Sequence, residues 1–371
     1  MISTSDAQKT GLDVFAYYLP QFHPISLNST WWGEGFTEWN STLRAVRGWR
    51  AIPGSVITPG ELGFYDLRSF EVRQRQGELA RLAKLSAFCV YHYYSCGEHL
   101  MPAAVEAMLS DGQPDVPFFF CWANHDWTLA WQNRPQDTIM KQRYDELAND
   151  NHIDWLLDAF ADPRYYKIGS APVIKIYDVA AIPHAGEVLA KWRNKARERG
   201  FSDLVILGRA PNDRYWSAGG CEVAAWVQDV LVPLRYMPAW QRVAGALRSP
   251  QTAVRLARFG DYPISRQLLK RANDRVFAGR SDFVPTVLTS FNNVGRRARR
   301  ASFLLGDPEG FAADLTDATR RAPVVRSPDG ARRLAGINAW NEWGESMAME
   351  PSTESGRALL EACASVLGGL G

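Results

Sequence analysis

Two glutamates three residues apart, Glu342 and Glu345, are the pair in this sequence best suited to acid–base chemistry. They follow an apolar run at residues 334–337, and Trp343 and Gly344 lie between them. A turn at Gly344 would bring both carboxylates to one side. Cleavage of a glycosidic bond needs one carboxyl group to protonate the leaving oxygen and a second to act as base or nucleophile. Close carboxylates also push their pKa values apart, so that one stays protonated near neutrality.

A structural interpretation of the same pair is also open. Glutamates at this spacing can pair with arginines at the rim of a barrel or cap a following helix. Their position directly after an apolar run, with an aromatic residue between them, does not decide between catalysis and structure. The decision depends on the elements that would position the pair.

Eight short apolar or β-branched runs recur along the chain and alternate with helical patterns. They are residues 13–19, 86–94, 116–124, 171–178, 203–209, 222–229, 283–291 and 333–343. Near-continuous hydrophobicity is typical of strands buried on both faces, and alternation with helices is typical of parallel βα units. Eight such units predict an α/β fold, a single (β/α)8 TIM barrel that occupies residues 1–371 as one catalytic domain.

Helical spacing of apolar residues predicts an outer ring that includes residues 70–85, 150–160 and 186–199. Two connections are longer than a barrel needs. Residues 20–69 hold many Trp, Gly and Pro residues, which predicts a long first βα loop that caps the top face without forming a helix. Residues 236–280 carry many arginines on an apolar background and predict a helical insertion before the seventh strand.

The working residues of such a barrel come from the C-terminal ends of the strands and the loops that follow. Polar and aromatic side chains gather at these ends, which predicts an aromatic-lined polar pocket. The substrate-binding residues predicted in this way are Tyr18, Gln21, His23, His92, Tyr93, Trp122, Asn124, Asp126, Trp127, Tyr177, Asn292 and Asn341.

Composition and charge exclude several classes of function. The net charge of +2 gives no reason to expect nucleic acid as a partner, and no apolar run is long enough to span a bilayer. The five cysteines form no CxxC pair, so neither a disulfide framework nor a thiolate metal site is indicated. The first residues lack the pattern of a secretory signal, so we expect a cytoplasmic protein.

Other motifs are weaker. Four histidines, His23, His92, His99 and His125, lack the spacing of a metal site, so we expect no metal and no other cofactor. The glycine-rich residues 33–36 do not open a helix after a strand as a dinucleotide loop would. The basic stretch at residues 295–300 is open to two interpretations, a phosphate site or a solvated helix start.

Several stretches together resemble one family, the WbsX-like polysaccharide-biosynthesis proteins, which are related to glycoside hydrolase family 99. The matching stretches are AYYLPQFHPI (16–25), WWGEGFTEWN (31–40), ELGFYDLR (61–68), FCVYHYY (88–94), CWANHDWT (121–128) and INAWNEWGESMAMEP (337–351). They run from the first predicted strand to the last, so the resemblance covers almost the whole chain.

The resemblance implies a (β/α)8 barrel and, in the hydrolase relatives, retaining endo-acting cleavage of α-mannosidic bonds. It implies that Glu342 is the base that acts on the sugar 2-hydroxyl, which gives an anhydro-sugar intermediate, and that Glu345 is the acid/base. The chain departs from the family pattern at His125, Asp126 and Ser346. We therefore expect a different sugar specificity.

The leading hypothesis is a carbohydrate-active enzyme that cleaves or transfers at an α-mannose-like sugar of an oligosaccharide or polysaccharide. Its sugar subsites would also include Trp32, Glu34, Trp39 and Trp343. The alternative is a glycosyltransferase of surface polysaccharide (O-antigen or capsule) biosynthesis, with residues 295–300 gripping donor phosphates. A third hypothesis is an inactive glycan-binding barrel. The insertion at 236–280 is compatible with peripheral membrane contact, and the sequence does not indicate an oligomeric state.

Overall fold

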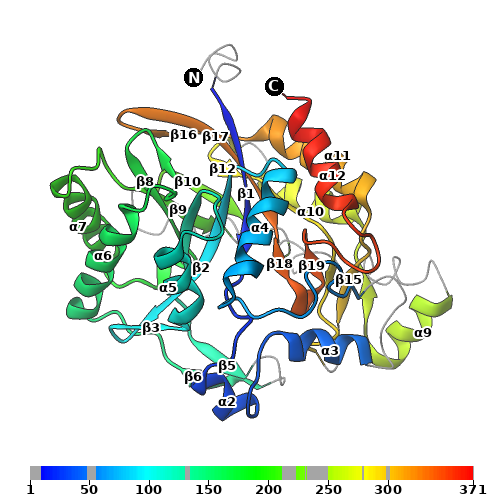
Figure 1. The fold of residues 1–371 in the computed structure, drawn as a ribbon. Coiled ribbons are helices and arrows are strands. Elements are labelled where there is room, and N and C mark those ends of the chain that lie inside the picture. The colour runs from blue at the N-terminus through cyan, green and yellow to red at the C-terminus, as the bar shows by residue number, and fades with distance from the viewer. Residues whose placement is uncertain are drawn as a thin grey trace.

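A curled, mainly parallel β-sheet forms the centre of the molecule (Figure 1). The computed structural model describes residues 10–47, 56–129, 134–210, 223–229, 231, 250–277, 280–297 and 301–370. The strands of the central path are, in spatial order, β12 (Phe283–Val284), β10 (Ala225–Gln228), β9 (Val205–Ala210), β8 (Ala171–Ile176), β4 (Phe118–Trp122), β2 (Ala87–Ser95), β1 (Leu12–Tyr18), β17 (Gly330–Asn338) and β13 (Thr286–Leu288). Neighbours along this path are parallel, and each of the eight predicted runs overlaps a strand of it.

The two ends of this path belong to one segment of chain. Only Pro285 separates β12 from β13, and proline has no N–H to donate to a strand ladder. β12 pairs with β10 on one side, and β13 pairs with β17 on the other. The sheet therefore curls round until this one segment is paired on both sides, which gives a TIM-barrel-like fold.

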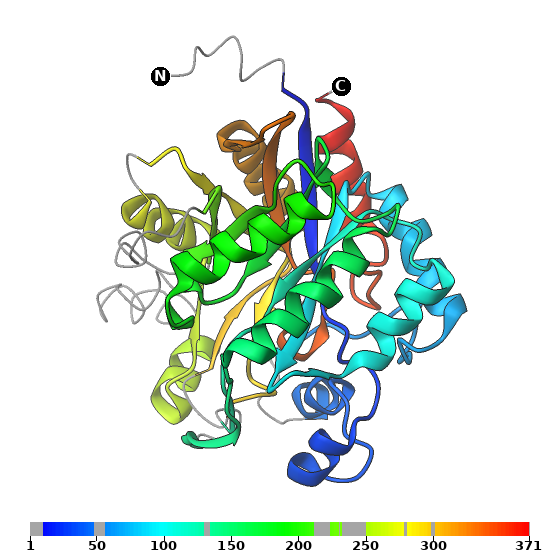
Figure 2. The same ribbon diagram turned by 90° about the vertical axis from the view of Figure 1, so that its left-hand side faces the viewer.

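Helices surround the sheet (Figure 2). They are α4 (Phe70–Leu82), α5 (Pro102–Asp111), α6 (Glu146–Phe160), α7 (Ala185–Glu198), α10 (Arg266–Val276), α11 (Pro308–Arg321) and α12 (Ala358–Gly368). The helices predicted at 70–85, 150–160 and 186–199 are confirmed as α4, α6 and α7. Among the described helices, none is both long enough and apolar enough to cross a membrane.

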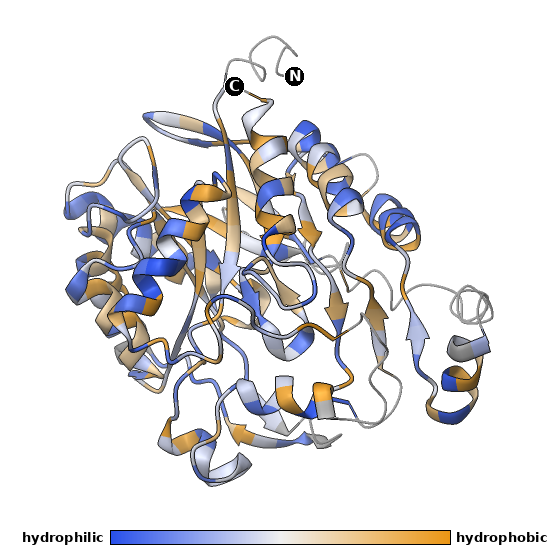
Figure 3. Ribbon diagram, turned by 45° about the vertical axis from the view of Figure 1, so that its right-hand side comes forward, coloured by the Kyte–Doolittle hydropathy of each residue, from blue (hydrophilic) through white to orange (hydrophobic). Residues whose placement is uncertain are grey.

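The core lies inside the sheet and between the sheet and the helices. Every residue of β4 and of β8 is buried, as strands covered on both faces require. Figure 3 shows hydrophobic residues along the central strands and a mixture of hydrophilic and hydrophobic residues on the helices around them. Each large apolar side chain buried in this way contributes about 1.5–3 kcal/mol. The resulting rigid scaffold holds the loops at the ends of the strands.

The segment 20–69 contains two helices, α2 (Ser26–Trp32) and α3 (Trp39–Arg47). The prediction that this segment forms no helix was therefore wrong: its many Gly and Pro residues lie around two short helices and outside them. In Figures 1 and 2, α2 and α3 lie at the end of the molecule opposite the N- and C-termini. A hairpin of β5 (Trp127–Leu129) and β6 (Arg134–Met140) lies at the same end.

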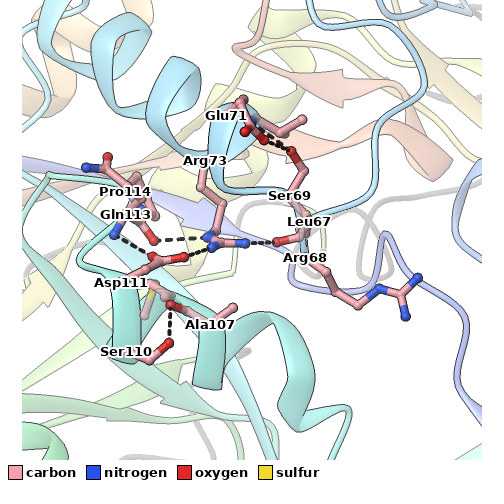
Figure 4. Close-up of polar contacts among 12 residues, drawn as sticks. Leu67, Arg68, Ser69, Glu71, Arg73, Ala107, Ser110, Asp111, Gln113 and Pro114 are labelled. Carbon is pink, nitrogen blue, oxygen red and sulfur yellow. Dashed lines mark hydrogen bonds and ion pairs between the residues drawn. The ribbon is translucent and has the colours of Figure 1, made fainter.

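A buried arginine of α4, Arg73, fastens the last part of the segment 20–69 to the rest of the protein (Figure 4). Its side chain is only 1% exposed and forms an ion pair with Asp111. Its Nη1 donates to the carbonyl of Leu67 at 2.6 Å, and its Nε donates to the carbonyl of Gln113 at 3.2 Å. These contacts fix the end of the capping segment against the turn that follows α5.

The predicted insertion contains α9 (Pro250–Phe259), the short strand β11 (Tyr262–Pro263) and α10, while residues 236–249 lie outside the described part of the chain. Two ion pairs link α10 to α11: Arg266 and Lys270 lie 2.8 Å and 2.6 Å from Asp314 and Asp317. α10 is therefore part of the outer ring.

Short elements complete the described structure. They are β3 (Glu98–Leu100), β7 (Lys167–Ile168), β14 (Phe291–Asn292), β15 (Ser302–Leu304), β16 (Val324–Ser327), β18 (Asn341–Glu342), β19 (Met347–Ala348), η2 (Val179–Ala181) and η5 (Trp343–Glu345). Four cysteines, Cys89, Cys96, Cys121 and Cys363, are free thiols, and Cys221 lies outside the described residues.

Candidate active site

A pocket of about 400 Å³ lies where the sheet strands end, next to α2 and the β5–β6 hairpin. It is lined by Leu19, Gln21, Asn28, Trp32, Glu38, Tyr91, Tyr93, Ala123, His125, Asp126, Trp127, Thr128, Ile139, Tyr177, Arg296, Glu342 and Glu345. These residues come from the first, second, third, fourth and eighth predicted strands, the segment 20–69 and the loops after the third, seventh and eighth strands. The pocket has the size of a small-molecule site and mixes aromatic with charged side chains.

The chain that carries the two glutamates leaves β17 and makes a tight turn. Glu342 ends β18, and Glu345 ends η5. Gly344, between them, leaves no room for a side chain: a Cβ there would lie 2.6 Å from Glu38 Oε2 and 3.0 Å from Arg296 Nη2. A glycine is therefore needed at this position, because a charged pair packs directly on its backbone.

One arginine, Arg296, contacts three carboxylates. Its Nη2 lies 2.8 Å from Glu38 Oε2 and 2.7 Å from Glu342 Oε1, and its Nη1 lies 3.0 Å from Glu345 Oε1. The side chains of Arg296 and Glu38 are 9% and 1% exposed, whereas those of Glu342 and Glu345 are 12% and 23% exposed. Both halves of the predicted pair thus lie together on one side of the turn and face the pocket, and both also make the arginine contacts of the structural interpretation.

The electrostatics of this cluster favour a proton on Glu342. Burial raises the pKa of Glu342 to about 8, and the neighbouring Glu345 and Glu38 also raise it, while Arg296 lowers it. Near neutrality Glu342 is therefore largely protonated, so the pair holds one proton that can be exchanged with a ligand.

A second buried carboxylate, Glu350, supports the loop from behind. It accepts hydrogen bonds from Trp343 Nε1 at 2.7 Å, Gln76 Nε2 at 2.6 Å and Tyr65 Oη at 2.8 Å. Burial raises the pKa of Glu350 to about 7, although these three hydrogen bonds lower it. Because Trp343 lies between the two glutamates in sequence, these hydrogen bonds position the turn that carries them.

Aromatic side chains form the walls of the pocket. Tyr93 Oη accepts a hydrogen bond of 2.6 Å from Gln21, and the edge of its ring meets Trp127 with centroids 5.4 Å apart. The Tyr177 ring lies 4.9 Å from the imidazole of His125, measured between ring centroids, and its centroid lies 4.2 Å from the guanidinium of Arg209. Flat apolar faces with polar edges are suited to stacking on the rings of sugars.

Comparison with known proteins shows the family of this chain. The model of the family described as glycosyltransferase WbsX matches residues 14–363. The chain belongs to the WbsX family. The resemblance read from the sequence motifs is therefore confirmed.

Relatives and solved structures extend the comparison. The uncharacterized protein WxcX of two strains of Xanthomonas campestris pv. campestris is 30% identical over 354 residues, which cover 94% of this chain and 48% of the relative. This WbsX family member thus spans about half the length of those relatives. A glycoside hydrolase-like protein is similar in structure with a TM-score of 0.58 and 15% identity, covering 96% of this chain and 94% of its own.

A GH99 endo-alpha-mannosidase of Bacteroides thetaiotaomicron has a TM-score of 0.54 and 14% identity, and the match covers 97% of this chain and 98% of that one. At identities this low, the structural similarity shows only that the fold is shared. The family model thus shows the family of this chain, and the two solved structures show its fold.

The WbsX family member brings part of the predicted substrate-binding set to the pocket. Besides Glu342 and Glu345, the predicted residues that line it are Gln21, Trp32, Tyr93, Asp126, Trp127 and Tyr177. Asp126 is held in place because its Oδ1 accepts a hydrogen bond of 2.7 Å from the backbone N–H of Gln142.

Three predicted residues on strands point the other way. Tyr18, His92 and Trp122 do not line the pocket and are buried toward the helices. Tyr18 donates to Gln76, His92 lies against His152, and Trp122 packs on Trp192. Successive side chains on a strand alternate between its faces, so the neighbours Tyr91, Tyr93 and Ala123 reach the pocket instead.

Other predicted residues hold the loops and do not reach the pocket. Asn124 bridges to the backbone of Asp178, Asn341 pairs with the backbone of Leu19, and Asn292 accepts from the backbone of Val294. Trp39 donates to the carbonyl of Tyr65 at 2.6 Å and packs near Trp343, which is itself buried. His23 is buried away from the pocket, and Glu34 is exposed outside it.

The sequence reasoning missed two charged residues of the site, Glu38 and Arg296. Glu38 lies four residues after Glu34 in the stretch WWGEGFTEWN and directly precedes α3. Arg296 lies in the basic stretch 295–300, for which a phosphate site or a solvated helix start was predicted; the structure instead turns its guanidinium onto three carboxylates. The available signal was that the glutamates near the eighth strand have no basic residue close to them in sequence, so a basic partner had to come from another part of the chain.

One departure from the family pattern has a conformational consequence. Ser346 has a φ of 52°, in the left-handed region where glycine is favoured. Its carbonyl accepts a hydrogen bond from Ser290 Oγ.

Within the described residues, no three His, Cys, Asp or Glu side chains are arranged to share a metal ion.

Proposed function

We propose that this protein is a carbohydrate-active enzyme that breaks or transfers a glycosidic bond with Glu342 and Glu345 as its catalytic pair. The observation that carries the proposal is the position of both carboxylates on one guanidinium at the wall of an aromatic-lined pocket. Glycosidases need two carboxyl groups on either side of one bond, in different protonation states.

The proposed roles follow the chemistry of the pair. Glu342 acts as the base toward a sugar hydroxyl, and Glu345 protonates the leaving oxygen. The reactive form is therefore the one in which Glu342 is ionised and the proton of the pair lies on Glu345. A pKa of Glu342 raised to about 8 makes its ionised form a stronger base than an ordinary carboxylate. The more exposed Glu345, at 23%, is the one a leaving group can reach more easily from the open side.

An α-mannose-like sugar is the proposed substrate. The similarity in fold to a GH99 endo-alpha-mannosidase over 97% of this chain supports this choice. We also infer a closed (β/α)8 barrel, which the pairing of β12 with β10 and of β13 with β17 supports. Substrate entry from the end that carries α2 suits an extended glycan.

A glycosyltransferase of surface polysaccharide biosynthesis is the second candidate, and the name of the WbsX family favours it. Its proposed phosphate grip at residues 295–300 has less support, because Arg296 already contacts Glu38, Glu342 and Glu345. An inactive glycan-binding barrel is the third. Two close buried carboxylates carry an electrostatic cost that binding alone does not need.

The test is product analysis by mass spectrometry with α-mannosides and bacterial surface oligosaccharides, with and without nucleotide sugars. We expect shortened products without a donor, and a loss of at least about 100-fold in Glu342→Gln and Glu345→Gln. Glu361→Gln, on the exposed face of α12, is the matched control. Extension only in the presence of a donor would favour the glycosyltransferase, and ligand binding without any product would favour the binding barrel.

A further inference from the structure

The pocket has an excess of negative charge. Among the described residues that line it, the carboxyl groups are Glu38, Asp126, Glu342 and Glu345, and the guanidinium of Arg296 is the permanent positive charge. Burial lowers the pKa of the remaining basic group, His125, to about 4, so this imidazole is uncharged at neutral pH. The charge excess persists even when Glu342 holds its proton.

The one guanidinium is not available to a ligand anion. Its Nη2 contacts both Glu38 and Glu342, and its Nη1 contacts Glu345. A phosphate or carboxylate that approached Arg296 would have to displace one of these carboxylates and would then lie beside the other two. Like charges brought this close repel strongly in a site with little water.

The hydrogen-bonding groups of the pocket also disfavour acidic ligands. Ionised carboxylates only accept hydrogen bonds, and so do phosphate and uronate groups. Glu38 Oε1 is buried and has no hydrogen-bond partner among the described residues. Its other oxygen, Oε2, already accepts from Arg296, so Glu38 adds negative charge beside the pocket and offers a ligand no hydrogen-bond donor.

We infer that this pocket binds neutral or amine-bearing sugars and excludes glycans that carry uronate, phosphate or other acidic groups at the reacting residue. The inference rests on the proposed function, in which a sugar lies against Glu342 and Glu345. An ammonium group in place of the 2-hydroxyl would then lie next to Glu342, where it would donate to a carboxylate.

The test is a set of four probes that differ in charge on one sugar framework. They are methyl α-D-mannopyranoside, methyl 2-amino-2-deoxy-α-D-mannopyranoside, methyl α-D-mannopyranosiduronate and mannose 6-phosphate. Binding is followed at pH 7 and low salt by tryptophan fluorescence, since Trp32 and Trp127 line the pocket. We expect the two acidic probes to bind at least about tenfold more weakly than the neutral one, and the amine to bind at least as tightly.

Variants identify which charged groups cause the difference in affinity between neutral and acidic probes. Glu38→Gln and Asp126→Asn each remove one negative charge and should narrow the gap between neutral and acidic probes, as should added salt. Glu361→Gln should leave the gap unchanged. Equal binding of the acidic and neutral probes would overturn the inference, and so would the absence of binding by both the neutral and the amine probe.

The two proposals can fail separately. A protein that binds the neutral mannoside but releases no product from any oligosaccharide would refute the proposed reaction and leave the charge preference standing. Cleavage of oligosaccharides whose reacting sugar is a uronate would leave the reaction standing and refute the charge preference.

Discussion

Glu342 Oε1 lies 2.7 Å from Nη2 of Arg296, an arginine contributed by a different loop 46 residues earlier in the chain. The same guanidinium reaches Glu345 and Glu38, so three loops meet at one cation. A planar fork with several donors can make these contacts at once, whereas the single ammonium of lysine cannot. Arg296 therefore fixes the relative positions of the two proposed catalytic carboxylates.

We expect Arg296→Lys to lower kcat/KM at least about tenfold, because the pair loses its common anchor. Arg296→Met should cost about 3–5 kcal/mol of stability, because it leaves buried carboxylates without a counter-ion. Steady-state kinetics and denaturant unfolding measure the two effects. The neighbouring Arg297→Lys serves as control, and wild-type kinetics in Arg296→Lys would contradict the anchoring role.

The pH dependence of kcat/KM tests the role of Glu342. Its pKa is raised to about 8, so the ionised, base form becomes populated only as the pH rises through that value. Because cleavage needs one ionised and one protonated carboxyl, we expect kcat/KM to be level from pH 6 to 7 and to fall as Glu342 gives up its proton above about pH 8. A rise through pH 8 would mean that the fully ionised pair is the active form, so neither carboxyl would act as the acid and the proposed roles would be wrong.

Glu38→Gln should shift the midpoint of this pH dependence of kcat/KM to lower pH. The carboxylate of Glu38 raises the pKa of Glu342, so its removal leaves Arg296 to stabilise the ionised form of Glu342 more effectively. The pH profile of the variant measures the shift. A profile with an unchanged midpoint and only a lower plateau would show that Glu38 acts on structure alone.

Strand alternation predicts a separation between pocket and core residues. Tyr93→Phe removes the hydroxyl that accepts a hydrogen bond from Gln21 at the pocket wall, so we expect KM to rise several-fold with a loss of about 0.5–1.5 kcal/mol in stability. The Trp122 side chain faces the helices, and Trp122→Phe removes its hydrogen bond to the carbonyl of Tyr94. We therefore expect this variant to lose about 1–3 kcal/mol in stability with KM unchanged. The opposite pattern would mean that Trp122 reaches the substrate.

The same alternation explains which parts of the fold and of the site could be predicted from the sequence. The eight strand runs could be predicted because near-continuous apolar segments carry a strong signal, and the pocket could be placed at their ends. The side of each strand that faces the pocket depends on the register, which a continuous apolar run does not reveal. That is why His92 was predicted to bind substrate in place of its neighbour Tyr91.

Long-range charge pairing was the other limit. Glu38, Arg296 and Glu342 lie far apart in sequence, and only the folded barrel brings them within hydrogen-bond distance. A basic stretch such as 295–300 carries no sign of the groups it will meet, so a phosphate and a carboxylate were equally consistent partners. The short helices α2 and α3 were missed for a related reason, since Gly and Pro residues dominate their surroundings.

Trp343 should link stability with activity. Its Nε1 donates to the buried Glu350 at 2.7 Å, and the residue lies between Glu342 and Glu345. We expect Trp343→Phe to lose about 1–3 kcal/mol, because a buried carboxylate loses a donor, and to lower kcat more than it raises KM. Thermal unfolding and kinetics measure both, with Trp31→Phe, an exposed residue of α2, as control.

Acid should destabilise the protein through a buried histidine pair outside the pocket. The Nε2 atoms of His92 and His152 lie 2.9 Å apart, and the His152 ring stacks on Tyr94 with centroids 4.1 Å apart. Burial lowers the pKa of both histidines, and it lowers the pKa of the nearby His99 to about 4. The folded state thus favours the neutral forms more strongly than the unfolded state does.

A histidine whose folded pKa lies below its unfolded value contributes stability above about pH 6.5 and loses it as the pH falls toward the folded value, at about 1.4 kcal/mol per unit of difference. We therefore expect the unfolding temperature to fall steeply between pH 6.5 and pH 4. The double variant His92→Phe/His152→Phe removes the two groups that must charge, so its profile should be flatter, whereas His184→Gln, with a side chain 79% exposed, should follow the wild type. If the double variant fell as steeply as the wild type, the acid sensitivity would have to come from the carboxylates, whose protonation weakens ion pairs such as that of Arg73 with Asp111.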